Sequence, residues 1–342
     1  MGRFRNATWS AVAVLCFAIA AFAQDGPPSI NGPILGFVAD GTGATIQPII
    51  GVLGASVVGR PLAFDSEIHN AVVSPKQNFA LATRGENAEV VLIRLAVDSV
   101  TTTSLDAVAA GADLIAISPS GTAAATYTHN NKVVRFITRL AQVPETAFQF
   151  DASDIPGRLQ RLAISDDGAL ALLNFRSGDD STLWVVSSIG SRWVLPAQRP
   201  SAASFLMGRH DAVIADDAAQ EVFVMRGIDQ EASRISVASF GDGFDGIADV
   251  AASADGLRIF ITTKKSETVT IVDLQATLST ALACHCVSTG LHPLKGTSVF
   301  RLSDPSNGAV AVLDASSSEP RIIVVPVMTA RTVSNSKGGE QQ

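Results

Sequence analysis

Short apolar runs recur along most of the chain, and clusters of Gly, Asp, Ser and Pro separate them. Typical runs are Val90–Ile93, Val133–Ile137, Leu183–Val186, Val222–Met225 and Val269–Val272. These runs are rich in β-branched and aromatic residues and lack the 3.6-residue apolar period of a helical face. The residues that bound them are turn formers. The pattern therefore predicts an all-β chain of short strands.

A turn with a central serine repeats at a nearly fixed spacing. Its clear copies are at Ser74, Ser118, Ser165 and Ser253, so 44, 47 and 88 residues separate them. Because 88 is twice 44, a divergent copy is expected near residue 209, and Ser204–Ala215 keeps the apolar, turn, apolar order there. A further copy surrounds Ser303. A unit of about 40 to 45 residues with four short strands is what a β-propeller blade requires, whereas a parallel β-helix has shorter repeats.

The turn sequences also resemble a known group of propellers. Ser118-Pro-Ser-Gly121 and Ser165-Asp-Asp-Gly168 place a glycine where a hairpin needs positive φ. They resemble the Ser-Pro-Asp-Gly turn that joins the two innermost strands of a blade in the WD40/YVTN-like superfamily, and Val269–Asp273 resembles its third strand. The chain lacks the Trp-Asp and Gly-His signatures of strict WD40 repeats, so the YVTN-like group fits better. The resemblance implies the architecture and says almost nothing about activity.

The two ends of the repeat region decide the expected number of blades. Strand-like pieces at Pro33–Val38 and Thr45–Ile50 precede the first clear turn, and Gly308–Leu313 and Arg321–Val327 follow the last one. These pieces can complete one shared blade, with an N-terminal strand closing the C-terminal blade, so six four-stranded blades are favoured. If Ala39–Thr45 is a degenerate copy of the turn, a shortened seventh blade results.

The termini predict an exported bacterial protein. Residues 1–23 have two arginines, an apolar stretch from Ala11 to Phe22 and an Ala-Phe-Ala cleavage site, which is typical of a signal peptide cut near Ala23. The stretch is shorter than the roughly 20 apolar residues that cross a bilayer, so no membrane insertion is expected. We expect a linker over 24–32, the propeller over 33–328, a disordered tail over 329–342, and a secreted or periplasmic monomer. The net charge of −7 argues against a nucleic-acid partner.

Two local motifs have residues of the kind found in metal or cofactor sites. Cys284 and Cys286 are the only cysteines beyond the predicted leader, and in an oxidising compartment a disulfide is the favoured interpretation. Free thiols, or a metal site completed by His285 or His292, are the alternatives, but zinc sites normally have wider cysteine spacing. Gly241–Gly246 matches G-x-G-x-x-G, yet the strand-like run after it and its two aspartates argue against a dinucleotide. A weak calcium site at Asp242 and Asp245 is the lesser alternative, and no metal and no cofactor is predicted.

The resemblance to propellers places the expected ligand face on the loops between second and third strands and on the segments that lead into first strands. The candidate ligand-binding residues in these loops are Arg84, His129, Asn130, Asn131, Arg176, Asp179 and Lys264. They would look the same if the loops were merely solvated. No catalytic residue is predicted, because no nucleophile-elbow, zinc-protease or P-loop motif occurs. The expected function is a binding or scaffold module for a protein, peptide or glycan. The alternative is an exported lactonase-like or other hydrolase, which requires His, Asp, Glu and Arg side chains converging at the mouth of the central channel.

Overall fold

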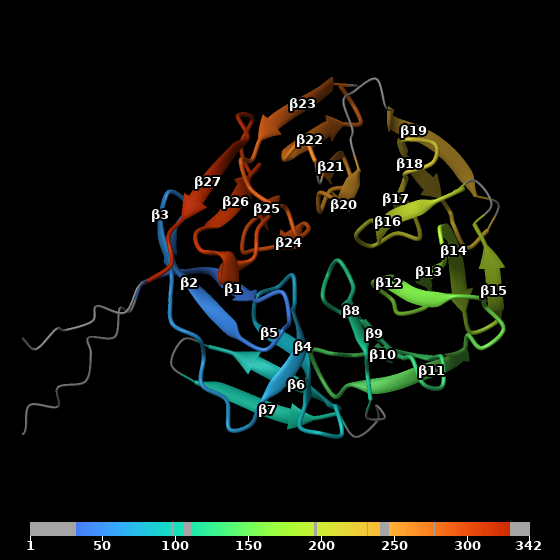
Figure 1. Ribbon diagram of the computed structural model, residues 1–342, viewed down its shortest axis with the longest axis horizontal. Helices are drawn as coiled ribbons and strands as arrows, with labels where there is room; N and C mark the ends of the chain where they lie inside the picture. Colours follow the sequence, from blue (N-terminus) through green and yellow to red (C-terminus); the bar gives the residue numbers. More distant parts are fainter. Residues whose placement is uncertain are drawn as a thin grey trace, which may run out of the picture. The chain divides into compact units, whose positions relative to one another are not determined.

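A computed structural model describes residues 32–328 except 97, 98, 106–110, 195, 196, 231, 240–245, 264 and 277. In this part of the chain, strands form seven sheets arranged around a common centre (Figure 1). One sheet has three strands and the others have four, and all neighbouring strands are antiparallel. The predicted all-β propeller with four-stranded blades is confirmed. The predicted leader, the tail and most of Gly241–Gly246 lie outside the described residues.

The blades follow one another along the chain. Blade 1 consists of β1 (Ile34–Ala39), β2 (Ile46–Val52) and β3 (Ala55–Val58). Blades 2 and 3 consist of β4 (Ile68–Val73), β5 (Phe79–Arg84), β6 (Glu89–Leu95), β7 (Val100–Ser104), β8 (Leu114–Ile117), β9 (Ala124–Thr128), β10 (Val133–Thr138) and β11 (Glu145–Asp151). Blades 4 and 5 consist of β12 (Arg158–Ile164), β13 (Ala171–Ser177), β14 (Asp180–Ser187), β15 (Gly190–Trp193), β16 (Pro200–Phe205), β17 (Ala212–Asp216), β18 (Glu221–Arg226) and β19 (Ser233–Ser239). Blades 6 and 7 consist of β20 (Ile247–Ala252), β21 (Arg258–Thr263), β22 (Thr268–Asp273), β23 (Leu278–Ala283), β24 (His292–Pro293), β25 (Val299–Arg301), β26 (Val310–Asp314) and β27 (Arg321–Val325).

The repeated serine closes the turn between the first and second strands of a blade. In blade 4 the Ser165 side chain is fully buried, and its Oγ accepts a hydrogen bond from the backbone N–H of Leu170 at 3.0 Å. Gly168 in the same turn has a φ of +71°, and its own N–H donates to the Ser165 carbonyl at 3.0 Å. The equivalent glycines of other turns, Gly121 and Gly256, have φ of +69° and +70°. The positive φ expected for these glycines is confirmed.

An aspartate replaces the serine in the first blade. The Asp40 carboxylate accepts hydrogen bonds from the backbone N–H of Ala44 at 2.9 Å and from the Thr45 hydroxyl at 2.8 Å. Gly43 has a φ of +66° and donates to the Asp40 carbonyl at 3.0 Å, as the glycine does in the serine turns. Because a carboxylate can accept the same turn N–H groups as a hydroxyl, Ala39–Thr45 is a degenerate copy of the turn. The favoured number of six blades is therefore wrong, and the alternative of seven is correct.

The ring closes differently from expectation. No N-terminal strand joins the last blade, since β1 to β3 form a sheet of their own. Instead, Val58 of β3 exchanges backbone hydrogen bonds with the segment after β27, donating to Pro326 at 2.8 Å and accepting from Met328 at 3.0 Å. The buried Arg301 guanidinium donates to the Ala39 carbonyl at 2.9 Å. Burial lowers the pKa of Arg301 to about 10, although nearby carboxylates oppose the shift, so the side chain stays charged at neutral pH.

One short strand lies inside the last blade. The Ser303 turn joins β25 to β26, and the Ser303 Oγ accepts from the Ala311 N–H at 2.9 Å as in the other turns. Therefore β25 corresponds to the first strands of other blades, and β24 is an additional strand on its inner side, near the centre of the ring (Figure 1). Its His292 thus lies near the centre of the ring.

The hydrophobic core is distributed between blades. Seven clusters of buried apolar side chains occur in the described residues, and each joins two neighbouring blades, including the last and the first. Apolar burial of this kind is the main favourable contribution to folding and makes each blade depend on its neighbours. The packing therefore gives a rigid ring on which loops can be held in fixed positions.

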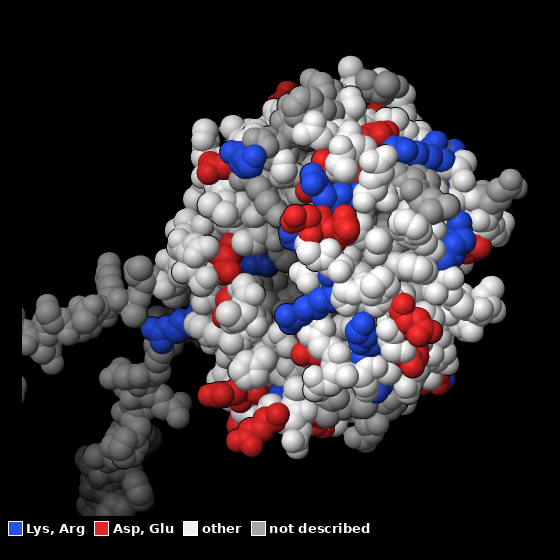
Figure 2. All heavy atoms as spheres, turned by 45° about the vertical axis from the view of Figure 1, so that its right-hand side comes forward, with Lys and Arg blue, Asp and Glu red and all other residues white. Residues whose placement is uncertain are grey.

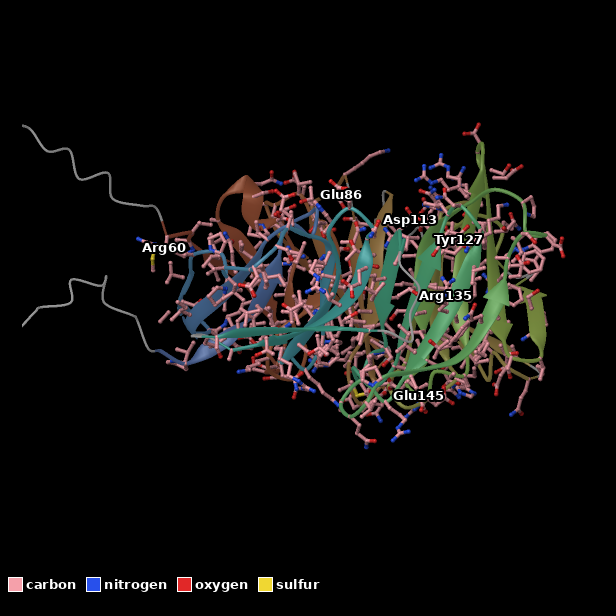
Figure 3. The ribbon with its side chains drawn as sticks, turned by 90° about the horizontal axis from the view of Figure 1, so that it is seen from below. Arg60, Glu86, Asp113, Tyr127, Arg135 and Glu145 are labelled. Atoms are coloured by element: carbon pink, nitrogen blue, oxygen red, sulfur yellow. A yellow bond between two sulfur atoms is a disulfide. The ribbon has the colours of Figure 1, made fainter. Side chains whose placement is uncertain are left out.

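The ring has two distinct faces, visible in side view (Figure 3). We define the loop face by the connections between second and third strands and by the segments that lead into first strands. Glu86 and Asp113 lie there, and Glu145 lies on the opposite side. We call this opposite side the turn face, because it carries the first turns of the blades and the connections between third and fourth strands. No helix among the described residues is long and apolar enough to span a membrane.

Candidate functional site

The predicted ligand-binding residues are spread over several blades of the loop face. Arg84, at the end of β5, is engaged in an ion pair with Glu89 at 2.7 Å. Asn130 and Asn131 lie between β9 and β10, where the Asn131 side chain accepts from the Val133 N–H at 3.2 Å. Asp179 lies at the exposed tip between β13 and β14. Lys264 lies outside the described residues. Two of the predicted residues, His129 and Arg176, lie next to Arg158, which was not predicted.

His129 is held by side chains of two blades. Its backbone N–H donates to the Asp113 carboxylate at 2.6 Å, and its ring lies edge-on to the Tyr127 ring with centroids 5.1 Å apart. The Arg158 Nε donates to the His129 Nε2 at 3.2 Å. Because arginine has no acceptor, this bond requires the imidazole proton on Nδ1. Burial and the Asp113 charge raise the pKa of the Tyr127 hydroxyl, with Arg158 opposing them, so the phenol stays neutral.

Arg158 and Arg176 are direct cross-strand partners at the loop-face ends of β12 and β13. The next pair along the strands, Leu159 and Phe175, is buried and fixes this register. Gly157 makes the close approach possible, since its φ is +93° and a Cβ there would lie 2.5 Å from the Arg176 carbonyl oxygen. Both arginine side chains are exposed. The sequence therefore places two cations side by side on the loop face. We call Arg158 and Arg176, together with the His129 ring that accepts from Arg158, the loop-face cation cluster.

Sequence reasoning missed Arg158, Asp113 and Tyr127. The segments that lead into first strands were expected on the ligand face, and Asp113 and Arg158 lie at the ends of two such segments. A signal was therefore present in the repeat register, because both residues stand directly at the start of a first strand. Tyr127 carried no such signal, because it is a strand residue in a run of apolar and hydroxyl side chains.

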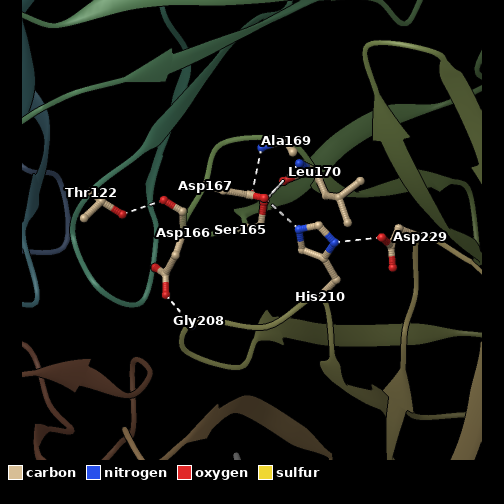
Figure 4. Close-up of polar contacts among 9 residues, drawn as sticks. All are labelled: Thr122, Ser165, Asp166, Asp167, Ala169, Leu170, Gly208, His210 and Asp229. Carbon is tan, nitrogen blue, oxygen red and sulfur yellow. Dashed lines mark hydrogen bonds and ion pairs between the residues drawn. The ribbon is translucent and has the colours of Figure 1, made fainter.

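A second polar group lies on the turn face, between blades 4 and 5 (Figure 4). The His210 Nε2 lies 2.8 Å from an Asp167 oxygen, and its Nδ1 lies 2.8 Å from an Asp229 oxygen. We call these three residues the His210 clasp. A recess of about 470 Å³ adjoins it, and the residues that line the recess are Asp166, Asp167, Gly208, Arg209, His210, Asp211, Gly227, Asp229 and Gln230.

The Asp166 carboxylate and the three residues of the clasp, which line this recess, are bonded to the protein itself. The Asp166 carboxylate bridges three blades by accepting from the backbone N–H groups of Ser120 and Gly208, each at 2.6 Å. Burial opposes the charge on His210, but hydrogen bonds to Asp229 and Asp167 outweigh it and raise the pKa of the imidazole. Burial alone would raise the pKa values of Asp167 and Asp229, but their hydrogen bonds outweigh it, so both pKa values are lowered. Since both ring nitrogens are engaged, the clasp offers no free lone pair for proton abstraction, and its arrangement fits a structural link.

A third group lies in the central channel. The Arg161 guanidinium of blade 4 reaches blade 6, where it lies 3.5 Å from the Asp249 carboxylate and donates to the Ala248 carbonyl at 2.8 Å. The Asp249 carboxylate also accepts from the Leu291 N–H at 2.9 Å. Burial raises the pKa of Asp249, with Arg161 opposing. Desolvation by the surrounding protein, together with the charges of Arg301 and Arg161, lowers the pKa of the His292 ring.

Cys284 and Cys286 form a disulfide, with Cα atoms 5.1 Å apart. Cys284 is buried in the apolar cluster between blades 6 and 7, whereas His285 is exposed. Both sulfurs are thus engaged with each other and are not thiolate ligands. Among the described residues, no group of three or more His, Cys, Asp or Glu side chains is arranged to hold a metal ion.

Comparison with known proteins places the fold but no closer relationship. No family model matches the sequence, and no curated protein matches it. A functionally unknown protein from Desulfotomaculum acetoxidans is similar in structure, with a TM-score of 0.57 and 13% identity over 86% of this chain and 100% of its own. A putative 6-phosphogluconolactonase from Bacteroides fragilis gives a TM-score of 0.56 and 14% identity, covering 88% and 97%. Another from Bacteroides uniformis gives 0.55 and 13%, covering 86% and 96%. The described residues form a seven-bladed β-propeller, and at these identities the likeness to the solved structures extends to the fold alone.

Proposed function

We propose that this protein is an exported binding module that meets a protein, peptide or glycan partner on its loop face. The observation that carries the proposal is the loop-face cation cluster, in which side chains of blades 3 and 4 converge beside an exposed strand end. The predicted signal peptide supports export. Loops held in place by a rigid scaffold are a common location for recognition, and the seven packed blade interfaces supply such a scaffold here.

The chemistry of the cluster favours recognition over catalysis. The His129 Nε2 lone pair is occupied by the Arg158 Nε–H, so the ring has no free acceptor for a substrate proton. Asp113 is committed to the His129 backbone. The remaining groups are arginine N–H donors, which bind and orient but do not exchange protons at neutral pH. Figure 2 shows positive and negative side chains interspersed on one face of the molecule.

The proposal is tested by selecting ligands for the immobilised full chain from a random peptide phage library and a glycan array. We expect enrichment that is lost with Arg158→Gln and kept with Arg226→Gln. Arg226 is the matched control because it is an exposed arginine at the end of β18, on the turn face. Enriched ligands that bind both variants equally would show that the loop face is not the recognition surface, and no enrichment at all would contradict a binding function.

A second candidate is hydrolysis of a lactone or similar ester in the central channel. The observation that favours it is the convergence of Arg161, Asp249 and His292 from three blades. In such a site Arg161 would stabilise a developing oxyanion, Asp249 with its raised pKa would transfer a proton, and neutral His292 would accept one. Two structural neighbours carry the name of putative 6-phosphogluconolactonases, which makes lactones the first substrates to try.

This candidate is tested by acid release from glucono-δ-lactone and 6-phosphogluconolactone at constant pH. If the protein is a hydrolase, turnover exceeds the spontaneous rate. This turnover should fall about 100-fold or more in Asp249→Asn, because a general acid or base typically contributes about 10²–10⁴-fold. The same loss is expected in His292→Gln, while Arg158→Gln keeps its activity. A rate equal to the background for both lactones would reject this candidate and leave the binding proposal untouched.

A further inference from the structure

We propose that Arg158 and Arg176 together bind an oxyanion of the partner, a carboxylate or a phosphate group. The inference rests on the proposed function and specifies the chemistry that its loop face recognises. Its basis is the placement of two guanidinium groups as direct cross-strand neighbours on the loop face of blade 4.

Neither arginine forms an ion pair within the described part of the chain, although the Asp113 carboxylate lies beside His129. Directly opposed residues have Cβ atoms about 4.5–5.5 Å apart, so like charges there repel each other. Some other surface arginines have an acidic partner, such as Arg139, which pairs with Glu145 at 3.2 Å. Carboxylates do lie on neighbouring connections, at Asp154, Asp179 and Asp180. Within the described residues neither Arg158 nor Arg176 forms an ion pair with any of them, so a bound anion would relieve the repulsion.

Each arginine is anchored in a way that leaves its outer nitrogens available. The Arg158 Nε donates to His129 at 3.2 Å, and the Arg176 Nε donates to the Gly178 carbonyl at 3.0 Å. In both side chains the terminal Nη1 and Nη2 groups have no partner among the described residues. These are the nitrogens that bind carboxylate or phosphate oxygens in bidentate fashion. Prior anchoring also reduces the conformational entropy lost on binding.

The surroundings add positive charge and hold the backbone in place. The Lys132 ammonium, on the loop next to His129, donates to the Ile155 carbonyl at 3.2 Å. The tight fit of Gly157 against the Arg176 carbonyl fixes the start of β12 relative to β13. Because both arginines are exposed, the site suits an anionic group that projects from a larger partner.

The test uses fluorescence anisotropy with the full chain and three labelled peptides that differ only in their side chains. The peptides carry four glutamates, two phosphoserines or four glutamines. We expect the glutamate or phosphoserine peptide to bind and the glutamine peptide not to bind. Preference between the two anionic peptides distinguishes carboxylate from phosphate. Inorganic phosphate should compete, and binding should weaken as salt rises from about 50 to 300 mM, because exposed charges are screened.

Variants locate the site. Binding is expected to weaken about tenfold or more in Arg158→Gln and in Arg176→Gln, because a charge-assisted hydrogen bond is lost. It should stay unchanged in Arg226→Gln and should weaken less in Arg176→Lys, which keeps the charge but not the fork. Circular dichroism of each variant checks folding. Equal binding of the glutamine peptide, or unchanged affinity in both arginine variants, would overturn the inference. If library selection then still yields neutral ligands that depend on the loop face, the proposed function stands without this anion chemistry.

Discussion

The His210 clasp should make the stability of the propeller depend on pH in a definite direction. A neutral imidazole has one N–H and one lone pair, so it cannot donate to two carboxylates at once. Both bonds in the clasp, at 2.8 Å each, therefore need the charged ring. The pKa of His210 is raised in the folded protein. Its stabilisation is accordingly complete below the unfolded value of about 6.5 and is lost as pH rises through the folded pKa.

The acidic partners set the lower limit of the same window. The pKa values of Asp167 and Asp229 are lowered by their hydrogen bonds against the opposing effect of burial. Their contribution is present above the unfolded value of about 3.9 and is lost as pH falls through the folded values. The clasp thus stabilises most between about pH 4 and 6.5. Side chains of His210, Asp167 and Asp229 are 32%, 53% and 24% exposed, so after solvent screening we expect about 1 kcal/mol in total.

Urea unfolding of the wild type and of His210→Gln at about pH 5.5 and pH 8.5 measures this effect as a double difference. From the lower to the higher pH, the free energy of unfolding of the wild type should fall by about 1 kcal/mol more than that of the variant. The comparison cancels the other histidines, including His292, whose lowered pKa gives a pH dependence of opposite sign. The extra loss should shrink at about 1 M salt, because partly exposed charges are screened. Identical pH dependence in the two proteins would refute the assignment of a charged His210 between two carboxylates.

Two further substitutions test how the ring is held together. Gly43 and Gly85 both have positive φ, +66° and +64°, but an added methyl at Gly43 would overlap the Ala71 backbone whereas Gly85 has open space. Gly85→Ala should therefore cost about 1 kcal/mol of unfolding free energy and Gly43→Ala about 3 kcal/mol, and equal costs in urea melts would contradict the close approach of blades 1 and 2. Arg301→Met removes the buried guanidinium at the closure, and it should cost about 3 kcal/mol. The substitution Arg94→Met, at an exposed position, should change the unfolding free energy by no more than about 0.5 kcal/mol. A comparably small effect of Arg301→Met in thermal or urea unfolding would show that the contact of Arg301 with Ala39 does not stabilise the closure.

The repeat pattern predicts most of the fold, and specific residues explain which parts it does not predict. The serine turns were predictable because, in most blades, a buried hydroxyl that accepts a backbone N–H occupies one fixed position. Blade 1 was harder to see because Asp40 takes the place of the serine and accepts from the turn N–H of Ala44 with a different side chain. The additional strand β24 was missed because a two-residue strand has no periodicity to detect.

The candidate site was predictable only in part. His129 lies in a loop, and Arg176 lies at a strand end beside a loop, on a face that follows from the repeat register. Their association through Arg158 depends on a side chain of one blade reaching another, and spacing along the sequence does not contain that information. The same limit applies to the clasp, where His210 reaches Asp167 at a separation of 43 residues. It also applies to the Arg161–Asp249 contact across the channel.

The most direct test of anion recognition on the loop face is a crystal structure of the full chain soaked with selenate, a tetrahedral oxyanion located by its anomalous scattering. The proposal predicts a peak between the guanidinium groups of Arg158 and Arg176 that disappears in crystals of Arg176→Gln. Anomalous peaks confined to the central channel or the turn face, with none at these two arginines, would contradict it.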